Sequence, residues 1–397
     1  MSELRVNKVT PRSGTTVTLG DSGDSVAIPT GVGFNGFGYR NIIINGDMSI
    51  AQRGTSFTSL AGVSQYNLDR WETIGINVGS GRYQVDQSTD TPTGFTYSQK
   101  ISCTTAEASQ DANNQLYLEQ QIEGLNSSYL NYYVASPDTV TLSFWVKANL
   151  TGSYSVALKL SDNGSAIDSG STRIYPTTYS ISSANTWEKK TITITLDSST
   201  SEVKVVNNGF AVATQFWLGA GTSRDGEATN AWKNNANATA TSDNLNLLGS
   251  TSNEWFITGV QLEAGTTASD FEFLPYDVNL QRCLRYYYKT KAIGANYPFG
   301  FCQCYSSTSA GCLVNFPVIM RTNPSALEQS GTATDYQLYT AGGSVATCSA
   351  VPAIASVDTT NLIGAVNFTV ASGISAGDVT QGTAANSNAY LAWSAEL

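Results

Sequence analysis

The chain has 397 residues and a formal net charge of −10; 41% of its residues are hydrophobic, only 13% are charged, and none is histidine. An acidic chain lacks the basic footprint that binding to phosphate backbones needs, so we expect no nucleic-acid partner. Without histidine, Ser-His-Asp or Cys-His nucleophile activation and imidazole acid–base catalysis are excluded. No apolar run approaches the roughly 18 residues of a membrane-spanning helix, so we expect no membrane insertion.

The N-terminus lacks the apolar core of a secretory signal, so we expect synthesis in the cytoplasm. Six cysteines occur, at positions 103, 283, 302, 304, 312 and 348. On a strand, Cys302 and Cys304 would lie on one face about 7 Å apart, which is too far for a relaxed disulfide. No C-x-x-C pair is present, so we expect reduced and mostly buried thiols.

Residues 1–38 are rich in Gly, Thr and Ser, and their early apolar residues are few. Such a segment cannot bury a core, so it is predicted to be an extended arm that docks on another protein. The stretch Gly31–Gly36 matches G-x-G-x-x-G, but it lacks the preceding strand, the following helix and the acidic residue that nucleotide binding needs. A glycine-rich hinge is the better interpretation of this motif.

Residues 39–276 show the period-2 alternation of strands. Val140, Leu142, Phe144 and Val146 alternate with more polar residues, and similar runs occupy 154–160 and 191–196. Asn-Gly dipeptides, typical of hairpin turns, separate some of these runs. No repeat of 20–50 residues is visible, which argues against a solenoid. The pattern predicts a β-sandwich.

One helix is predicted at 277–290, where Asp277 can cap the first turn. Leu280, Leu284 and Tyr287 follow at i, i+4 and i+7. Residues 291–397 alternate again, and we expect a second β-rich unit there, a C-terminal β-sandwich. The expected fold is therefore all-β, with one short helix linking two domains.

Aromatic residues in polar surroundings are candidate sugar platforms, because a ring face stacks on a pyranose while amides and carboxylates bond its hydroxyls. Trp232 in the run 230–237 and Tyr336 and Tyr339 in the run 335–340 fit this description. The alternative for each is a ring folded over the adjacent sheet. Glycan hydrolysis would need a carboxylate pair, but nothing selects one among 31 Asp and Glu residues, so we expect no enzyme.

A series of segments between Tyr39 and Tyr287 resembles, in order, a domain common in phage tail-fibre and other virion proteins. The segments are 39–54, 68–71, 118–125, 142–147, 187–194, 256–265, 271–276 and 280–287. Residues 316–324 and 389–397 resemble the tip domain that often follows it, and residues 3–8 resemble the start of marine phage fibre proteins.

The resemblance implies a jelly roll similar to carbohydrate-binding modules. Such modules often hold one structural calcium where the first and last strands lie side by side, and here those strands carry Asp47 and Glu263 as candidate ligands. The alternative is that Asn45-Gly46 makes a turn and Glu263 faces solvent. No other cofactor is expected.

These observations together predict a homotrimeric subunit of a virion fibre, on the tail or another external position. Residues 1–38 would attach it to a tail, baseplate or adaptor protein. Leu280, Leu284 and Tyr287 would face their copies near the threefold axis, and the C-terminal domain would bind a host-surface glycan or protein. Two alternatives remain: a purely structural capsid-attached fibre or tail adaptor, and a surface-glycan depolymerase.

Overall fold

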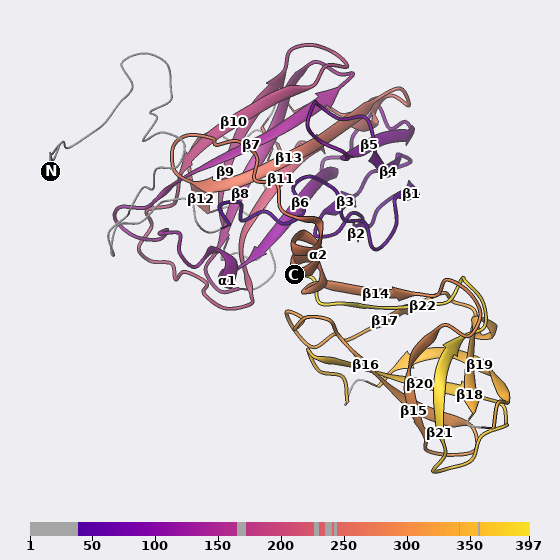
Figure 1. The fold of residues 1–397 in the computed structure, drawn as a ribbon. Coiled ribbons are helices and arrows are strands. Elements are labelled where there is room, and N and C mark those ends of the chain that lie inside the picture. Colours follow the sequence, from indigo (N-terminus) through magenta and orange to yellow (C-terminus); the bar gives the residue numbers. More distant parts are fainter. Residues whose placement is uncertain are drawn as a thin grey trace, which may run out of the picture. The chain divides into compact units, whose positions relative to one another are not determined.

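The computed structural model describes residues 39–164, 172–225, 230–234, 240–241, 244–340, 342–355 and 358–397. The chain divides into two units, Met1–Tyr39 and Arg40–Leu397, and every helix and strand of the described residues belongs to the second unit (Figure 1). The predicted docking arm, 1–38, lies outside the described residues. The expectation of an all-β protein is confirmed, since strands dominate the second unit.

A six-stranded antiparallel sheet forms one layer of a jelly-roll β-sandwich, in the order β1-β4-β5-β13-β7-β10. Its strands are β1 (Ser56–Leu60), β4 (Arg82–Ser88), β5 (Ser98–Thr105), β7 (Thr139–Ala148), β10 (Glu188–Thr195) and β13 (Glu254–Ala264).

A seven-stranded antiparallel sheet forms the other layer, in the order β12-β9-β8-β11-β6-β3-β2. Its strands are β2 (Ser64–Tyr66), β3 (Glu72–Ile76), β6 (Gln115–Glu123), β8 (Gly152–Ser161), β9 (Thr172–Ile181), β11 (Phe210–Ala220) and β12 (Lys233–Asn234). Two short helical turns, α1 (Gly124–Ser127) and η1 (Leu247–Gly249), connect strands of the sandwich.

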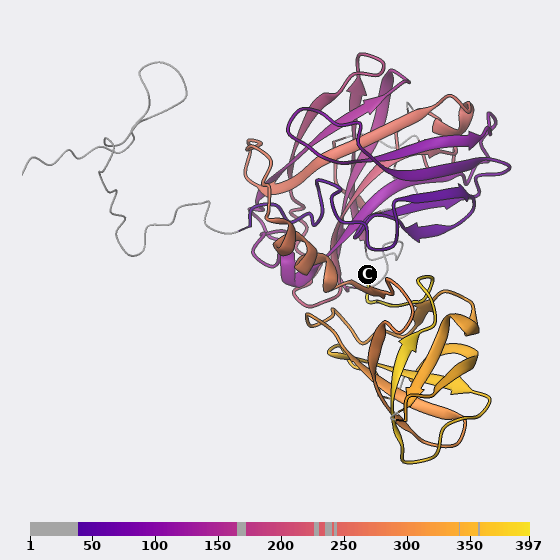
Figure 2. The ribbon, with the colours of Figure 1, turned by 45° about the vertical axis from the view of Figure 1, so that its right-hand side comes forward.

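The hydrophobic core lies between the two sheets, which face each other in Figure 2. Val140, Leu142, Phe144 and Val146 of β7 all point into it, as their alternation predicts. The opposing sheet contributes Phe216, whose ring meets Phe144 edge to face at 5.0 Å. Burial of these apolar side chains, at roughly 25 cal/mol per Å², is the main force that holds the sandwich together.

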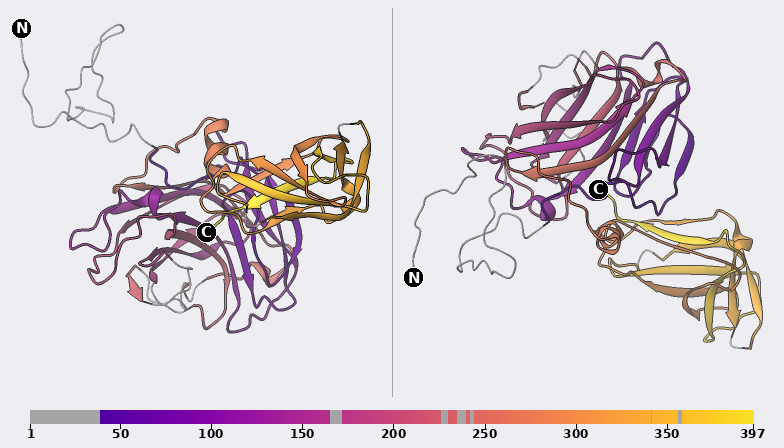
Figure 3. Two further views of the ribbon diagram at one scale, coloured as in Figure 1. Left: turned by 90° about the horizontal axis from the view of Figure 1, so that it is seen from below. Right: turned by 45° about the horizontal axis from the view of Figure 1, so that its top comes forward.

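The C-terminal strands close into a six-stranded barrel in the order β15-β16-β20-β19-β18-β21, drawn in orange to yellow in Figure 3. They are β15 (Pro298–Cys304), β16 (Ser309–Asn315), β18 (Tyr336–Thr340), β19 (Val345–Ile354), β20 (Ile363–Val370) and β21 (Val379–Ala384). This corrects the expected C-terminal sandwich. Barrels and sandwiches share the same alternation, and the difference arises because β21 pairs with both β15 and β18.

A three-stranded sheet, β14-β22-β17, is formed by segments that come before, between and after the barrel strands in the sequence. Its apolar side chains belong to the same hydrophobic core as those of the barrel. It consists of β14 (Tyr287–Lys291), β17 (Leu327–Gln329) and β22 (Tyr390–Ser394), and the 3-10 turn η2 (Ala333–Asp335) precedes β18. Trp393 of β22 is fully buried, and its ring stacks on Tyr288 at 5.9 Å.

The linking helix is shorter than predicted. Helix α2 (Tyr276–Leu284) ends before Tyr286 and Tyr287. Tyr287 instead pairs with Ser394 as the first residue of β14. Tyr287 is only 1% exposed, and its hydroxyl donates to Glu328, so it does not share a helix face with Leu280 and Leu284. The expectation that Tyr287 faces other copies on a threefold axis is therefore wrong. Leu280 itself packs against Ile44, Ile50, Cys283 and Tyr286 of the same chain.

The expectation of reduced thiols is wrong for one pair. Cys302 on β15 and Cys312 on β16 lie directly opposite each other and form a disulfide. The remaining four cysteines are free and buried, as expected. Among the described residues, neither helix has the length and apolar character to cross a membrane.

Arginine side chains connect the sandwich to the C-terminal strands. Arg285 donates to both oxygens of Glu123, at 2.8 and 3.0 Å. Arg321 donates to the carbonyl oxygens of Ala395, at 2.7 Å, and Asn208, at 2.8 Å. Buried Arg70 pairs with Glu396, and its guanidinium lies over the Tyr286 ring. Such multidentate contacts fix geometry because the planar guanidinium presents several donors at once.

Candidate functional site on the barrel wall

A groove of about 640 Å³ lies on the outer wall of the barrel. Strands β15, β16 and β20 form its floor, and the segments around Asp358 and Gly377 form part of its rim. Its lining residues are Phe301, Cys302, Gln303, Tyr305, Gly311, Cys312, Leu313, Ala355, Asp358, Ile363, Ala365, Val366, Asn367, Gly377 and Val379. The volume falls within the roughly 300–1,000 Å³ that is typical of ligand pockets.

The floor is exposed because of strand alternation. Cys302 and Cys304 point into the barrel, so the residues between and beside them point out. Phe301 is 74% exposed and Tyr305 is 60% exposed, and Leu313 on the neighbouring strand is 57% exposed. Large apolar side chains left in water side by side mark a binding surface more often than singly exposed ones do.

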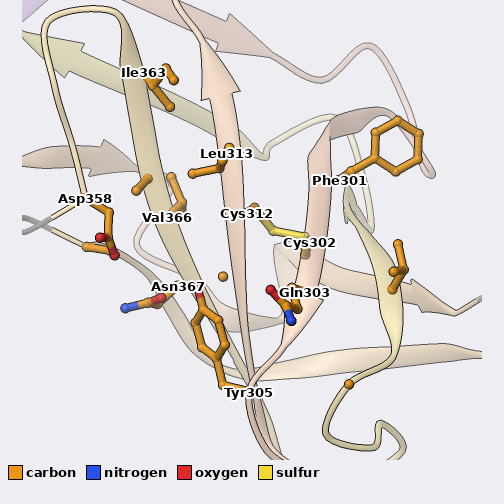
Figure 4. A pocket seen from close by; sticks show the side chains of 15 residues that line it. Phe301, Cys302, Gln303, Tyr305, Cys312, Leu313, Asp358, Ile363, Val366 and Asn367 are labelled. Carbon is orange, nitrogen blue, oxygen red and sulfur yellow. A yellow bond between two sulfur atoms is a disulfide. The ribbon is translucent and has the colours of Figure 1, made fainter.

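Tyr305 lies across the backbone of Gly311. A Cβ atom at Gly311 would come within 2.1 Å of the Tyr305 hydroxyl oxygen and 2.5 Å of its Cζ atom. Only glycine therefore lets the ring lie flat on the sheet at this point. Figure 4 shows the ring between the amide side chains of Gln303 and Asn367.

The strand register explains this arrangement. Gly311 pairs with Gln303 on one side and with Asn367 on the other, so the two amides flank the ring. Among the residues that the structure describes, neither amide nor the Asp358 carboxylate forms a side-chain hydrogen bond. The groove therefore combines an aromatic floor with donors and acceptors that are free to bind a ligand.

The disulfide lies directly beneath this floor. It joins Cys302 to Cys312, which occupy facing positions on the two strands that carry Phe301, Gln303 and Leu313. A cross-link between paired strands limits how far they can separate. The side chains above it are thus held at a fixed spacing.

The predicted sugar-platform residues are not brought together. Trp232 is half-buried against the sandwich core, where its Nε1 donates to the Thr195 carbonyl at 2.8 Å. Tyr336 is fully buried in the barrel core. Its hydroxyl accepts from the Ser330 amide at 2.9 Å and donates to the Tyr390 carbonyl at 2.7 Å. The interpretation of Tyr336 as an exposed platform is wrong, since its polar neighbours in sequence do not share its strand face.

Tyr339 lies nearer to the groove. It is 40% exposed on β18, and Gln381 of β21 pairs with both Tyr339 and Phe301. Paired residues point to the same side of a sheet, so Tyr339 lies on the outer wall one strand beyond the groove. It does not line the groove itself.

The two predicted calcium ligands are bound by separate partners. Asp47 accepts from Ser49 and Asn279, each at 3.1 Å. Glu263 is buried rather than solvent-facing, and both its oxygens accept from Ser269. Within the described ranges no group of three or more His, Cys, Asp or Glu side chains is placed to hold a metal ion. The calcium site stays a prediction.

A carboxylate pair does occur in the sandwich. Glu72 of β3 lies directly opposite Glu119 of β6. Burial and, to a smaller extent, the charge of Glu119 together raise the pKa of Glu72 to about 8, although nearby arginines oppose the change. Two carboxylates with different protonation states are a requirement for glycoside hydrolysis, but neither residue lines the barrel groove.

The groove residues left a signal in the sequence. Once Cys302 and Cys304 are assigned to the buried face, Phe301, Gln303 and Tyr305 must occupy the other face. Their exposure was therefore predictable, whereas the approach of Tyr305 to Gly311 depends on a pairing between two strands.

No protein-family model matches this chain, and no curated protein matches it. Among known structures, it is similar to the enzymatically active domain of tailspike protein 4 of bacteriophage CBA120, with a TM-score of 0.29, 10% identity and 57% of this chain covered. The match spans only 22% of that tailspike chain.

Two carbohydrate-binding modules are also similar. For a family 4 module, the TM-score is 0.26 at 15% identity, covering 56% of this chain and 98% of the module. For the family 11 module of a cellulosomal cellulase from Clostridium thermocellum, the TM-score is 0.28 at 8% identity, covering 53% and 95%. At these TM-scores the likenesses carry no argument about this chain, and its jelly roll rests on its own strand pairings.

Proposed function

We propose that this chain is a non-enzymatic subunit of a virus particle that binds a host-surface glycan through the barrel groove. The observation that supports glycan binding is the Tyr305 ring, which lies on Gly311 between two unbonded amides. An exposed ring flanked by amides matches the alternating apolar faces and hydroxyls of a pyranose. The virion assignment is supported by the ordered resemblance of residues 39–287 to phage fibre proteins.

The groove favours an uncharged sugar. Among the described residues that line it, Asp358 alone carries a charge, and the whole chain is acidic. An anionic polysaccharide would be repelled at the rim without gaining a cationic partner. Neutral hexoses and N-acetylhexosamines have hydroxyl and amide groups that Gln303 and Asn367 can bond.

The test is binding of the full chain to an array of neutral glycans and to host cells. Replacing Tyr305 with alanine removes the stacking platform, and we expect a loss of about tenfold in affinity. Tyr129→Ala is the matched control, because Tyr129 is 51% exposed and lies on the sandwich. If Tyr305→Ala binds as tightly as the parent, the groove is not the glycan site.

The assembly forms part of the same proposal. A homotrimer organised around α2 would use Leu280 and Leu284, which are only partly buried, rather than the buried Tyr287. Sedimentation should give three times the chain mass, and a monomer at micromolar concentration would contradict the trimer.

Two alternatives have their own readouts. A purely structural fibre or adaptor would leave host cells unbound while the fold is intact. A depolymerase would release reducing ends from host polysaccharide, and its first candidates would be Glu72 and Glu119.

A further inference from the structure

A second hollow of about 330 Å³ lies on the outer face of the six-stranded sheet. Its lining residues all precede those of the barrel groove in the sequence. Three phenylalanines form one wall. Phe95, Phe271 and Phe273 contact one another with ring centroids 4.8 to 5.2 Å apart. Phe273 is nevertheless 56% exposed, so this cluster is not part of the core.

A β-bulge places a fourth ring in the same hollow. The pairing of β13 with β7 is interrupted between Thr258 and Gln261, and Gly259 adopts φ +61° there. A Cβ atom at Gly259 would lie 2.6 Å from Cζ of Phe95 and 3.1 Å from Cδ1 of Trp145. The glycine thus allows both rings to approach one point of the backbone, and bulges of this kind often re-aim side chains beside binding sites.

The rim carries polar groups of both signs. Lys189 lies opposite Trp145 in the β10–β7 register, and Asp270 and Thr93 also line the hollow. In the part of the chain that the structure describes, none of these three side chains has a hydrogen bond or ion pair. One cation and one anion leave the hollow without net charge.

Phe273 also lines another hollow of about 280 Å³, together with Thr96, Tyr97 and the exposed Tyr276. One exposed ring therefore stands between two adjacent hollows. A ligand with at least two rings would fill both hollows and contact Phe273 between them.

We infer that this surface is a second saccharide-binding site, which takes an uncharged oligosaccharide of two or more hexopyranose units. The aromatic walls fit the apolar faces of the sugars, and the unbonded rim groups fit their hydroxyls. Across the two hollows Lys189 stands against Asp270 and Asp47, and this excess of one negative charge disfavours an anionic ligand. The inference is independent of the barrel groove, since the described residues that line the two sites do not overlap.

The test uses the full chain labelled with 5-fluorotryptophan, which gives separate ¹⁹F signals for its seven tryptophans. Trp145→Phe identifies the Trp145 signal. Cellobiose, lactose and maltose are the uncharged probes at millimolar concentration, and glucuronic acid is the charged one. At least one uncharged disaccharide should shift the Trp145 signal in the parent and equally in Tyr305→Ala, which separates this site from the groove.

Phe273→Ala should weaken that response about three- to tenfold, and Lys189→Gln should weaken it without touching any ring. The six other tryptophan signals report whether each variant keeps its fold. The inference is overturned if no uncharged probe shifts Trp145, if only glucuronic acid does, or if Phe273→Ala responds like the parent. A shift that follows protein concentration without sugar would identify a second copy as the occupant and would also overturn it.

Discussion

Replacing Glu72 with glutamine should make the protein more stable at neutral pH and leave it unchanged in acid. Burial, with a smaller contribution from the facing Glu119 carboxylate, raises the pKa of Glu72 from its ordinary 4.5 to about 8. Glu119 is itself 1% exposed and accepts from the side-chain amides of Gln121 and Gln215. Because the folded-state pKa is raised, the contribution of Glu72 to stability is fully present below pH 4.5 and is lost as pH rises through 8.

The magnitude follows from the same values. The rise in the pKa of Glu72 from 4.5 to about 8 corresponds to a loss of about 5 kcal/mol in the free energy of unfolding over the whole pH range, at about 1.4 kcal/mol per pKa unit. At pH 7 the destabilisation reaches about 3 kcal/mol. The side chain is only half-buried, so solvent screening lowers this figure, and we expect a gain of about 1.5–3 kcal/mol for Glu72→Gln at pH 7.

Urea unfolding of parent and variant at pH 5, 6, 7 and 8 measures this difference. Glu107→Gln is the control, because hydrogen bonds from Ser80 lower the pKa of Glu107 and its titration lies below this range. The difference between Glu72→Gln and the parent should grow steadily from pH 5 to pH 8. A difference that stays constant, or a variant that is less stable at every pH, would refute the assignment of a raised pKa to Glu72.

Two further substitutions test the barrel. Gly311→Ala would place a Cβ atom 2.1 Å from the Tyr305 hydroxyl oxygen, so it should displace the ring. Glycan binding should weaken as much as in Tyr305→Ala, while the unfolding midpoint stays near that of the parent. Unchanged binding would show that the flat ring is not needed. Tyr336→Phe removes a hydroxyl that bonds Ser330 and Tyr390, so it should lower the free energy of unfolding by about 1–3 kcal/mol without changing glycan binding. A loss of binding with intact stability would restore Tyr336 as a ligand contact.

Local pattern predicted most of the strands and their buried faces, because period-2 alternation depends only on neighbouring residues. Val140 to Val146 illustrate this, since every second side chain lies in the core. The barrel was not predictable in the same way. Its closure depends on β21 pairing with both β15 and β18, which are distant from it in the sequence.

The predicted end of the helix and the prediction of reduced thiols were wrong for related reasons. Helical spacing includes Tyr287, but pairing with Ser394, far along the chain, extends a strand to that residue instead. Cys302 and Cys304, which share one strand, form no disulfide with each other, as expected. Cys302 instead forms a disulfide with Cys312 across a hairpin. The turn sets that register, through the bond from the Tyr305 amide to the Ser309 carbonyl at 2.8 Å.

The candidate site shows the same division between local and non-local information. Exposure of Phe301, Gln303 and Tyr305 follows from the burial of the cysteines between them, but polar neighbours in sequence wrongly favoured Tyr336. What makes the groove specific is the row of paired residues Gln303, Gly311 and Asn367, which come from three strands. Sequence alone cannot align such a row, because its members are set by register.

The groove and the disulfide together argue for a rigid site. Its ligand-facing side chains come mainly from paired strands, and the Cys302–Cys312 bond fixes two of those strands from below. A site that is already ordered loses little conformational entropy when it binds, so a shallow surface can still hold a sugar. Each groove alone should nevertheless be weak, since its ligand stays half in water. In the fibre proposed above, several copies would bind at once, and their avidity would exceed the affinity of a single site by up to about 10²–10⁴-fold. Binding by an isolated chain should therefore be far weaker than binding by an assembled fibre, while Tyr305→Ala should weaken both.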